Sequence, residues 1–163
     1  MQCFEGHSSE VTGIAISNIT NTVVSCASTG DGTAKVWRMD CGGEAFSTKP
    51  AELGLSAVAL HSATGTLYAA TRDGIVTAWD INTGTRKNRL VGLGEVTTMW
   101  VDATGKYLLA SDIGGAIFLW DIEKPEILAY MAMDGGIIGF DVFDGVPELN
   151  KARKPGKLGE QRG

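Results

Sequence analysis

Three stretches of the chain end alike and decide the fold: GDGTAKVWRMD at 30–40, RDGIVTAWDIN at 72–82 and GGAIFLWDIEK at 114–124. In each stretch, a glycine turn leads into a short apolar run that closes on a tryptophan. Trp79 follows Trp37 by 42 residues, and Trp120 follows Trp79 by 41. A self-similar period of about 40–45 residues with a Trp-Asp ending is typical of a four-stranded repeat unit. The sequence therefore predicts three copies of one β unit.

Aligning the units on their tryptophans places a first strand at the start of each. In unit one this strand is VTGIAIS at 11–17. The apolar residues at corresponding positions of the three units are Val11, Ile14 and Ile16, then Leu55, Val58 and Leu60, then Val96, Met99 and Val101. The positions between them, such as Ala15, Ala59 and Trp100, are apolar as well. We expect strands whose two faces both pack against neighbouring units.

Further strands follow in each unit, separated by turn signals such as Thr64-Gly65 and Thr104-Gly105, where glycine takes the positive φ that the turn needs. Second strands are predicted at 22–28, 66–71 and 106–111, and third strands at 33–37, 75–79 and 116–120. Fourth strands are predicted at 44–48, 85–91 and 126–132. No segment has sustained helical periodicity, so the pattern predicts an all-β protein.

Over about residues 4–142 the chain resembles the WD-repeat β-propeller family. Unit one carries the family's motif as Gly6-His7, Ser28, Asp31-Gly32 and Trp37. The resemblance implies that the side chains of His7, Ser28, Asp31 and Trp37 form a hydrogen-bonded structural tetrad inside one blade. The two ring N–H groups donate, the carboxylate accepts and the hydroxyl does both. A buried network of this kind stabilises a blade only when every member is satisfied.

Units two and three keep only parts of this motif. The retained members of these partial tetrads are Thr71, Asp73, Trp79, Ser111 and Trp120. Lys49-Pro50 and Gly92-Leu93 stand where a Gly-His pair would precede each unit, and Gly114 replaces the aspartate of unit three. We therefore expect a complete tetrad in blade one alone.

The order of strands predicts three complete four-stranded antiparallel blades plus an orphan strand at each end, at about 2–5 and at 137–142. Closed propellers typically have 4–8 blades, so this is a partial propeller. Residues 1–144 are expected to form it, with repeats at about 4–40, 45–84 and 88–124, the start of a fourth at 126–142, and a disordered basic tail at 145–163. The chain is interpreted as a fragment of a longer propeller, with completion by separate chains or self-association as the alternative.

Charge argues against nucleic acid as a partner. The tail at 145–163 has five basic and two acidic residues, which leaves nine basic against 17 acidic residues in the body. Phosphate binding needs clustered cations, and an acidic body lacks them. The tail is rich in Pro, Gly and Lys and has little apolar surface to bury, which is typical of a solvated end.

Cysteine content and hydropathy bear on location. Cys3, Cys26 and Cys41 are odd in number and have no CxxC spacing, so neither a disulfide framework nor a zinc site is expected. No apolar run of 18 residues exists, so no membrane-spanning helix is expected, and the polar start MQCFEGHSSE does not resemble a signal peptide. These features predict an intracellular, cytoplasmic protein, and a cytoskeletal or ciliary setting is the alternative.

The candidate catalytic and metal-binding residues each have another explanation. His7, Ser28 and Asp31 are the residue types of a hydrolase triad, but the tetrad accounts for all three and no GxSxG elbow is present. His61 lacks Cys or His partners and is interpreted as a turn residue. The stretch DVFDG at 141–145 lacks the spacing and closing Glu of a calcium loop. We expect no catalytic residue, no metal and no cofactor.

The function that fits these features is a non-catalytic scaffold that binds protein or peptide partners through loops on one rim. The candidate partner-binding residues, in loops before first strands and between second and third strands, are Ser9, Glu10, Gly30, Arg72, Glu95 and Ile113. Arg72 is the foremost candidate, because an exposed arginine can anchor a carboxylate or an aromatic group; its alternative is a solvated turn residue. A structural subunit of a large assembly is the second hypothesis, and an enzyme on a propeller scaffold is the third.

Overall fold

The computed structural model describes residues 3–91 and 94–132, and within these ranges it has twelve β-strands and no helix. Blade one consists of β1 (Val11–Ser17), β2 (Thr22–Ala27), β3 (Ala34–Arg38) and β4 (Glu44–Ser47). Blade two consists of β5 (Leu55–His61), β6 (Thr66–Thr71), β7 (Val76–Asp80) and β8 (Arg86–Leu90). Blade three consists of β9 (Val96–Val101), β10 (Tyr107–Asp112), β11 (Ala116–Asp121) and β12 (Glu126–Ala132).

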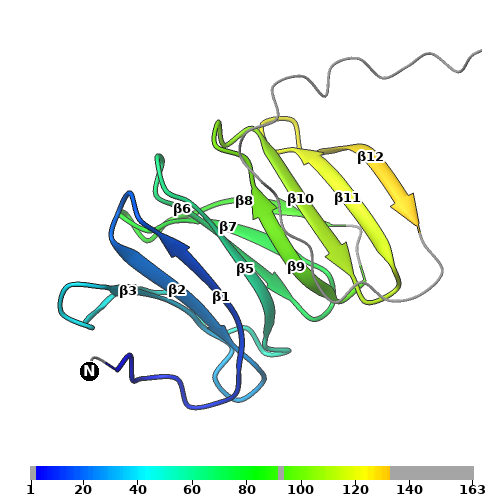
Figure 1. Ribbon diagram of the computed structural model, residues 1–163. Helices are drawn as coiled ribbons and strands as arrows, with labels where there is room; N and C mark the ends of the chain where they lie inside the picture. The colour runs from blue at the N-terminus through cyan, green and yellow to red at the C-terminus, as the bar shows by residue number, and fades with distance from the viewer. Residues whose placement is uncertain (1–2, 92–93, 133–163) are drawn as a thin grey trace, which may run out of the picture.

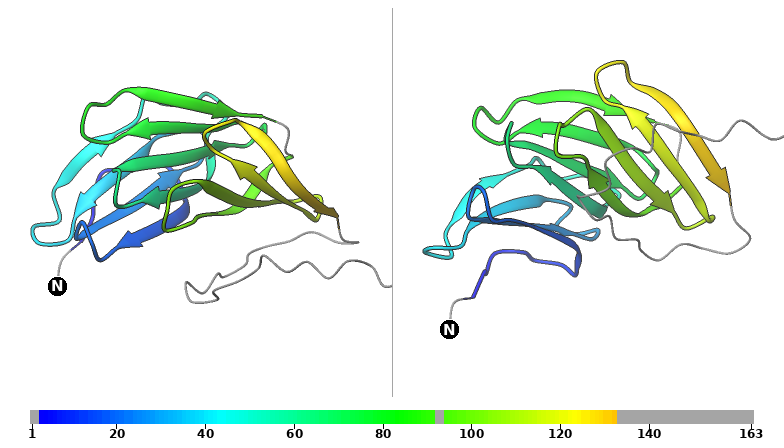
Figure 2. Two further views of the ribbon diagram at one scale, coloured as in Figure 1. Left: turned by 90° about the horizontal axis from the view of Figure 1, so that it is seen from above. Right: turned by 45° about the horizontal axis from the view of Figure 1, so that its top comes forward.

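Each blade is an antiparallel meander in which the order of strands in space is their order in sequence. The three sheets stand side by side, with β1, β5 and β9 adjacent along one edge and β4, β8 and β12 at the opposite edge of their sheets (Figures 1 and 2). The second, third and fourth strands lie within one residue of their predicted bounds. The predicted all-β fold of three four-stranded blades is thus confirmed.

Two hydrophobic clusters fill the spaces between the blades. The first joins Val24 and Val36 of blade one to Val58 and Leu67 of blade two. The second joins blade two to blade three and contains, among others, Tyr68, Val76, Met99, Leu108 and Trp120. Blade two contributes to both clusters because alternate residues of a strand point to opposite faces of the sheet. Its strands are therefore apolar on both faces, as the sequence predicts.

The repeated tryptophans share one orientation relative to the row of blades. Trp79 packs against the cluster between blades one and two, and Trp120 belongs to the cluster between blades two and three. Each therefore faces the preceding blade. Val36 points into the first cluster, so the alternation of β3 turns its neighbour Trp37 to the other face of blade one, away from blade two. That face is where a preceding blade would lie.

The first hairpin of each blade turns through a residue with positive φ. Gly65 and Gly105 take this conformation in blades two and three, with φ of 61° and 72°. In blade one the corresponding position is Asn21, with φ of 52°. Asparagine tolerates the left-handed region better than other residues with a side chain, so the same hairpin forms without a glycine.

The orphan strand expected near the N-terminus is corrected by the structure. Residues 3–5 have no strand assignment. A strand requires the backbone of a neighbouring strand, and the described residues offer none beside this segment. Phe4 instead packs near Trp37, with ring centroids 6.0 Å apart. The orphan strand expected at 137–142 and the tail at 145–163 lie outside the described residues.

Candidate functional site

A hydrogen-bonded network joins three segments of blade one. His7 lies 3.1 Å from Asp31 (Nδ1 to Oδ2) and 2.7 Å from Ser25 (Nε2 to Oγ). The Trp37 indole donates to the same Ser25 oxygen at 2.7 Å. In a neutral imidazole, Asp31 keeps the ring proton on Nδ1, so Nε2 accepts from the Ser25 hydroxyl. Ser25 then accepts one hydrogen bond and donates another, and every polar atom of the network is satisfied.

Asp31 also connects the entry loop to the turn before β3. The backbone N–H of Ser8 donates to its Oδ2 at 2.7 Å, and the backbone N–H of Thr33 donates to its Oδ1 at 2.9 Å. The Thr33 hydroxyl donates to the same carboxylate. Burial raises the pKa of Asp31, but the hydrogen bonds from Thr33, Ser8 and His7 outweigh it and hold the pKa well below its usual range. The network therefore contains an ionised carboxylate at neutral pH.

The serine of this network is Ser25, whereas the sequence motif pointed to Ser28. Trp37 pairs with Val23 across the sheet, and Ser25 lies two residues further along β2 on the same face. Ser28 follows the end of β2. Its carbonyl instead accepts from the N–H groups of Asp31 and Gly32 in the turn. His7, Asp31 and Trp37 come together as predicted, and strand alternation is the signal that could have identified Ser25.

Blades two and three lack the hydroxyl that the network needs. By register, Ala69 and Ala110 stand where Ser25 stands in blade one. The single hydroxyl proton of Thr71 can be donated to the Asp73 carboxylate or to the carbonyl of Ile75, both of which lie in its own turn. Ser111 is fully buried and shares a hydrogen bond of 2.8 Å with Thr97. The predicted partial tetrads at Trp79 and Trp120 therefore have alanine where the tetrad hydroxyl should be, and Thr71 and Ser111 serve local contacts.

Asp112 is a residue that the motif comparison missed. It is buried at the end of β10, where it accepts from the backbone N–H of Gly94 at 3.2 Å and of Ala116 at 2.9 Å. Asp31 makes the same two kinds of contact in blade one, to the entry loop and to the turn before the third strand. Asp112 thus supplies the loop-fastening part of the network from a position two residues before Gly114.

The predicted rim residues converge on a shallow pocket at one end of the inner strands. Glu10, Arg72, Glu95 and Ile113 all line it, and its volume is about 360 Å³. Arg72 Nε lies 3.7 Å from a Glu95 carboxylate oxygen, and its Nη2 lies 3.5 Å from the Ser28 hydroxyl. Both separations are long, so the guanidinium keeps donors for a further group. Loops of all three blades therefore contribute to one exposed polar and apolar surface.

Ser9 and Gly30 lie beside one another but do not line this pocket. The Ser9 hydroxyl donates to the carbonyl of Thr29 at 2.9 Å, which ties the entry loop to the β2–β3 turn. A Cβ added at Gly30 would meet nothing nearer than the Ser9 hydroxyl oxygen at 3.9 Å. Of the six predicted partner-binding residues, the structure thus groups four at the pocket and leaves Ser9 and Gly30 outside it.

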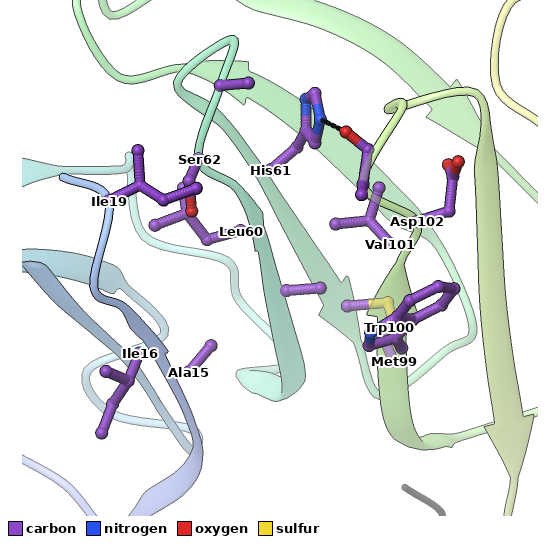
Figure 3. Close-up of a pocket in the computed structure, with 13 residues that line it drawn as sticks. Ala15, Ile16, Ile19, Leu60, His61, Ser62, Met99, Trp100, Val101 and Asp102 are labelled. Carbon is purple, nitrogen blue, oxygen red and sulfur yellow. Dashed lines mark hydrogen bonds between the residues drawn. The ribbon is translucent and has the colours of Figure 1, made fainter. Parts of the chain in front are cut away.

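A second hollow lies at the opposite end of the inner strands, where the first hairpins turn (Figure 3). It has a volume of about 300 Å³ and is lined mainly by apolar residues, including Ile16, Leu60 and Trp100. His61 at its edge is buried, and its Nε2 lies 3.1 Å from the carbonyl of Ala103 in blade three. His61 therefore links two blades, a role that its interpretation as a turn residue did not include.

Among residues 3–91 and 94–132, no three His, Cys, Asp or Glu side chains gather as metal ligands would. No helix in those ranges is long and apolar enough to cross a bilayer.

The comparisons with known proteins agree on the fold. The family model for "WD domain, G-beta repeat" matches residues 1–38, which contain the whole network of blade one. A crystal structure of the RRP9 WD40 repeats superposes with a TM-score of 0.70 at 12% identity, covering 80% of this chain and 41% of that chain. The three blades therefore have the fold of WD40-repeat propeller blades, and residues 1–38 also match the sequence model of the repeat. A structure of U3-55K gives the same TM-score of 0.70 at 14% identity and the same coverages of 80% and 41%.

A curated protein also matches this chain in sequence. Autophagy-related protein 16 of Arabidopsis thaliana is 30% identical over 77 residues, which are 47% of this chain and 15% of that protein. This chain thus spans less than half of the two solved chains and about a seventh of this relative.

Proposed function

We propose that this chain is a non-catalytic scaffold that binds a protein or peptide through the pocket formed by Glu10, Arg72, Glu95 and Ile113. The observation that carries the proposal is the convergence of these four residues, from loops of three different blades, on one exposed surface. Residues on loops held by a rigid sheet are typical of binding sites. WD-repeat proteins commonly serve as interaction scaffolds, and the likeness of fold supports this class of function.

The chemistry of the pocket suits a short peptide with one polar and one apolar anchor. Arg72 and Glu95 are partly exposed, with 42% and 36% of their side chains accessible, so their ion pair contributes little stability and can be exchanged. Arginine is well suited to a carboxylate or an aromatic ring. Ile113, which is 61% exposed, offers an apolar contact next to it.

The proposal is of a non-catalytic protein, and the geometry of the network in blade one supports this part of it. Ser25, His7 and Asp31 are connected in the order of a hydrolase triad. However, Ser25 is only 6% exposed and its oxygen already accepts from the Trp37 indole. A nucleophile needs room for a substrate carbonyl, and this hydroxyl is enclosed. The network is therefore interpreted as structural support.

The experiment selects ligands first and then maps where they bind. A random peptide library would be displayed against the full chain, and the affinity of the selected peptides measured by fluorescence anisotropy. We expect Arg72→Ala and Ile113→Ala each to weaken binding by about tenfold or more, as residues central to an interface do. Lys124→Ala is the matched control, because Lys124 is an exposed cation in the β11–β12 turn, outside the pocket.

Equal affinity of the selected peptides for wild type, Arg72→Ala and Ile113→Ala would contradict the proposed site. Loss of binding in Lys124→Ala alone would move the site to the other end of the blades. A cytoplasmic location remains part of the proposal, supported by the exposed free thiols of Cys3 and Cys41. Its test is the redox state of these thiols in cells, since oxidised Cys3 and Cys41 would contradict a reducing compartment.

A further inference from the structure

The face of blade one that points away from blade two has the pattern of a packed interface, but its inner part, on β1, has no neighbour among the described residues. Ile14 and Ile16 of β1 are 67% and 63% exposed on it. By register, Ile14 corresponds to Val58 of β5 and Met99 of β9. Those two residues are only 5% and 8% exposed, because a preceding blade covers them. The same apolar position is thus buried in blades two and three and exposed in blade one.

The far face of blade three shows the complementary pattern. Trp100 and Leu109 pair across β9 and β10 on the face opposite the second cluster, and both are only half-buried. Their counterparts in blade two, Ala59 and Tyr68, are each 4% exposed because blade three covers them. Blade three therefore presents the kind of face on which a following blade packs.

We propose that two copies of this chain associate head to tail, with the far face of blade three of one copy packed on the open face of blade one of the other. The chain already contains this joint twice, between blades one and two and between blades two and three. A second copy is the partner that carries both matching faces. Large exposed apolar patches are uncommon on monomers and mark interaction surfaces.

The proposed contact lies on the inner strands. The outer part of the open face is occupied by the chain's own N-terminal segment, in which Phe4 and His7 pack against the Trp37 ring. Ile14 and Ile16 remain uncovered beside it. Trp100 and Leu109, also on the two innermost strands of their blade, would meet them there.

Two such joints give a closed assembly. A head-to-tail contact generates a ring if its rotation closes and an open filament if it does not. Two copies joined in this way place six described blades in one ring, which is within the range of about 4–8 blades in closed propellers. The proposed state is therefore a dimer with two identical joints.

The test measures the mass of the full chain by sedimentation velocity over a hundredfold range of concentration. Wild type should form a dimer. Ile14→Glu/Ile16→Glu blocks the open face of blade one, Trp100→Glu blocks the far face of blade three, and each should raise the dissociation constant by more than about tenfold. Leu53→Glu is the matched control, since Leu53 is 53% exposed in the linker between β4 and β5, away from both faces. It should leave the dimer intact.

Mixing the two blocked variants gives the decisive result. The first variant keeps its blade-three face and the second keeps its blade-one face, so the mixture should recover a one-to-one dimer through a single joint. A monomeric wild type, a mixture that stays monomeric, or a growing series of higher oligomers would each overturn the proposal. If Trp100→Glu unfolds, Trp100→Thr replaces it, because threonine keeps a strong preference for strands. Peptide binding at the rim plays no part in this readout.

Discussion

A single hydroxyl decides whether the network of blade one is satisfied. Ser25 accepts from the indole of Trp37 and lies 2.7 Å from His7, so it connects the strand that carries the tryptophan to the loop that carries the histidine. Both Ser25 and Trp37 are buried. A buried donor that loses its partner keeps the full cost of its removal from water.

We expect Ser25→Ala to destabilise the fold by about 1–3 kcal/mol, because the Trp37 N–H and one nitrogen of His7 lose their shared partner. Ser28→Ala should change stability by no more than about 0.5 kcal/mol, since Ser28 acts through its backbone carbonyl, which the substitution retains. Denaturant unfolding of the two variants and wild type measures the difference. If Ser28→Ala lowers stability more than Ser25→Ala does, Ser28 and not Ser25 would supply the hydroxyl of the tetrad.

Asp31 gives the protein a specific sensitivity to acid. Its pKa is lower in the folded chain than in the unfolded chain, where a carboxyl of this type titrates near about 3.9. Its contribution to stability is therefore fully present above that value and is lost as the pH falls further. Asp31→Asn should lower the melting temperature at pH 7 and should lose less additional stability than wild type between pH 5 and 3.

Thermal melts from pH 7 to 3 measure this difference. Glu52→Gln is the matched control, because Glu52 is an exposed carboxylate with no hydrogen bond or ion pair described. It should follow the wild-type curve. Parallel curves for wild type and Asp31→Asn would show that Asp31 does not contribute to acid sensitivity.

At the residue scale the sequence predicted residue types better than positions. His7, Asp31 and Trp37 meet as the motif implies, because the motif fixes them relative to one another. The serine was misplaced because counting along the chain ignores which face of β2 a residue occupies. The same counting missed Asp112, which fastens the entry loop of blade three from two residues before the expected position.

At the scale of elements, the linker between blades packs closely on the turn of the preceding blade. Gly54 lies just before β5 with φ of 73°. A Cβ there would lie 2.6 Å from the carbonyl carbon of Ser28 and closer still to the backbone N of Thr29. A Cβ at Gly30, where φ is 100°, would make only an ordinary contact, with the Ser9 hydroxyl oxygen at 3.9 Å. Both glycines therefore have a left-handed backbone, but only at Gly54 would a side chain also collide with neighbouring backbone atoms.

Gly54→Ala and Gly30→Ala should both cost stability through the left-handed backbone, by about 1 kcal/mol or more. Gly54→Ala should cost about 1–3 kcal/mol beyond that, because the backbone of blade one must move to admit the methyl group. Chemical denaturation of the two variants makes the comparison. Equal losses would mean that the linker yields without cost and that the blades are less rigidly joined than the contact distances indicate.

Strand positions were predictable because alternation and turn residues are local signals. The fourth strands were found despite weak patterns, since β8 and β12 follow well-defined turns. The strand expected at the N-terminus was not observed in residues 3–5, since pairing depends on a partner strand and not on local sequence. Local propensity cannot supply that partner.

At the scale of the whole molecule, the three blades form a row in which β1, β5 and β9 lie next to one another along one edge (Figure 2). The loops of the rim could be assigned from the repeat, because equivalent loops of successive blades must lie side by side. The depth of the rim pocket and the apolar hollow at the hairpin end could not, because both depend on how far neighbouring sheets are rotated. The hollow near Trp100 is therefore a finding of the structure alone.

The four tryptophans divide into two optical classes. Trp37 and Trp120 are 2% and 1% exposed, whereas Trp79 and Trp100 are half-buried. An indole shielded from water emits at shorter wavelength and resists quenching by iodide. In the wild-type protein, the short-wavelength edge of the emission should therefore report mainly on Trp37 and Trp120, and the long-wavelength edge on Trp79 and Trp100. Coincident unfolding curves at the two edges would show that the row of blades melts as one cooperative unit, and separate curves would show that parts of it open first.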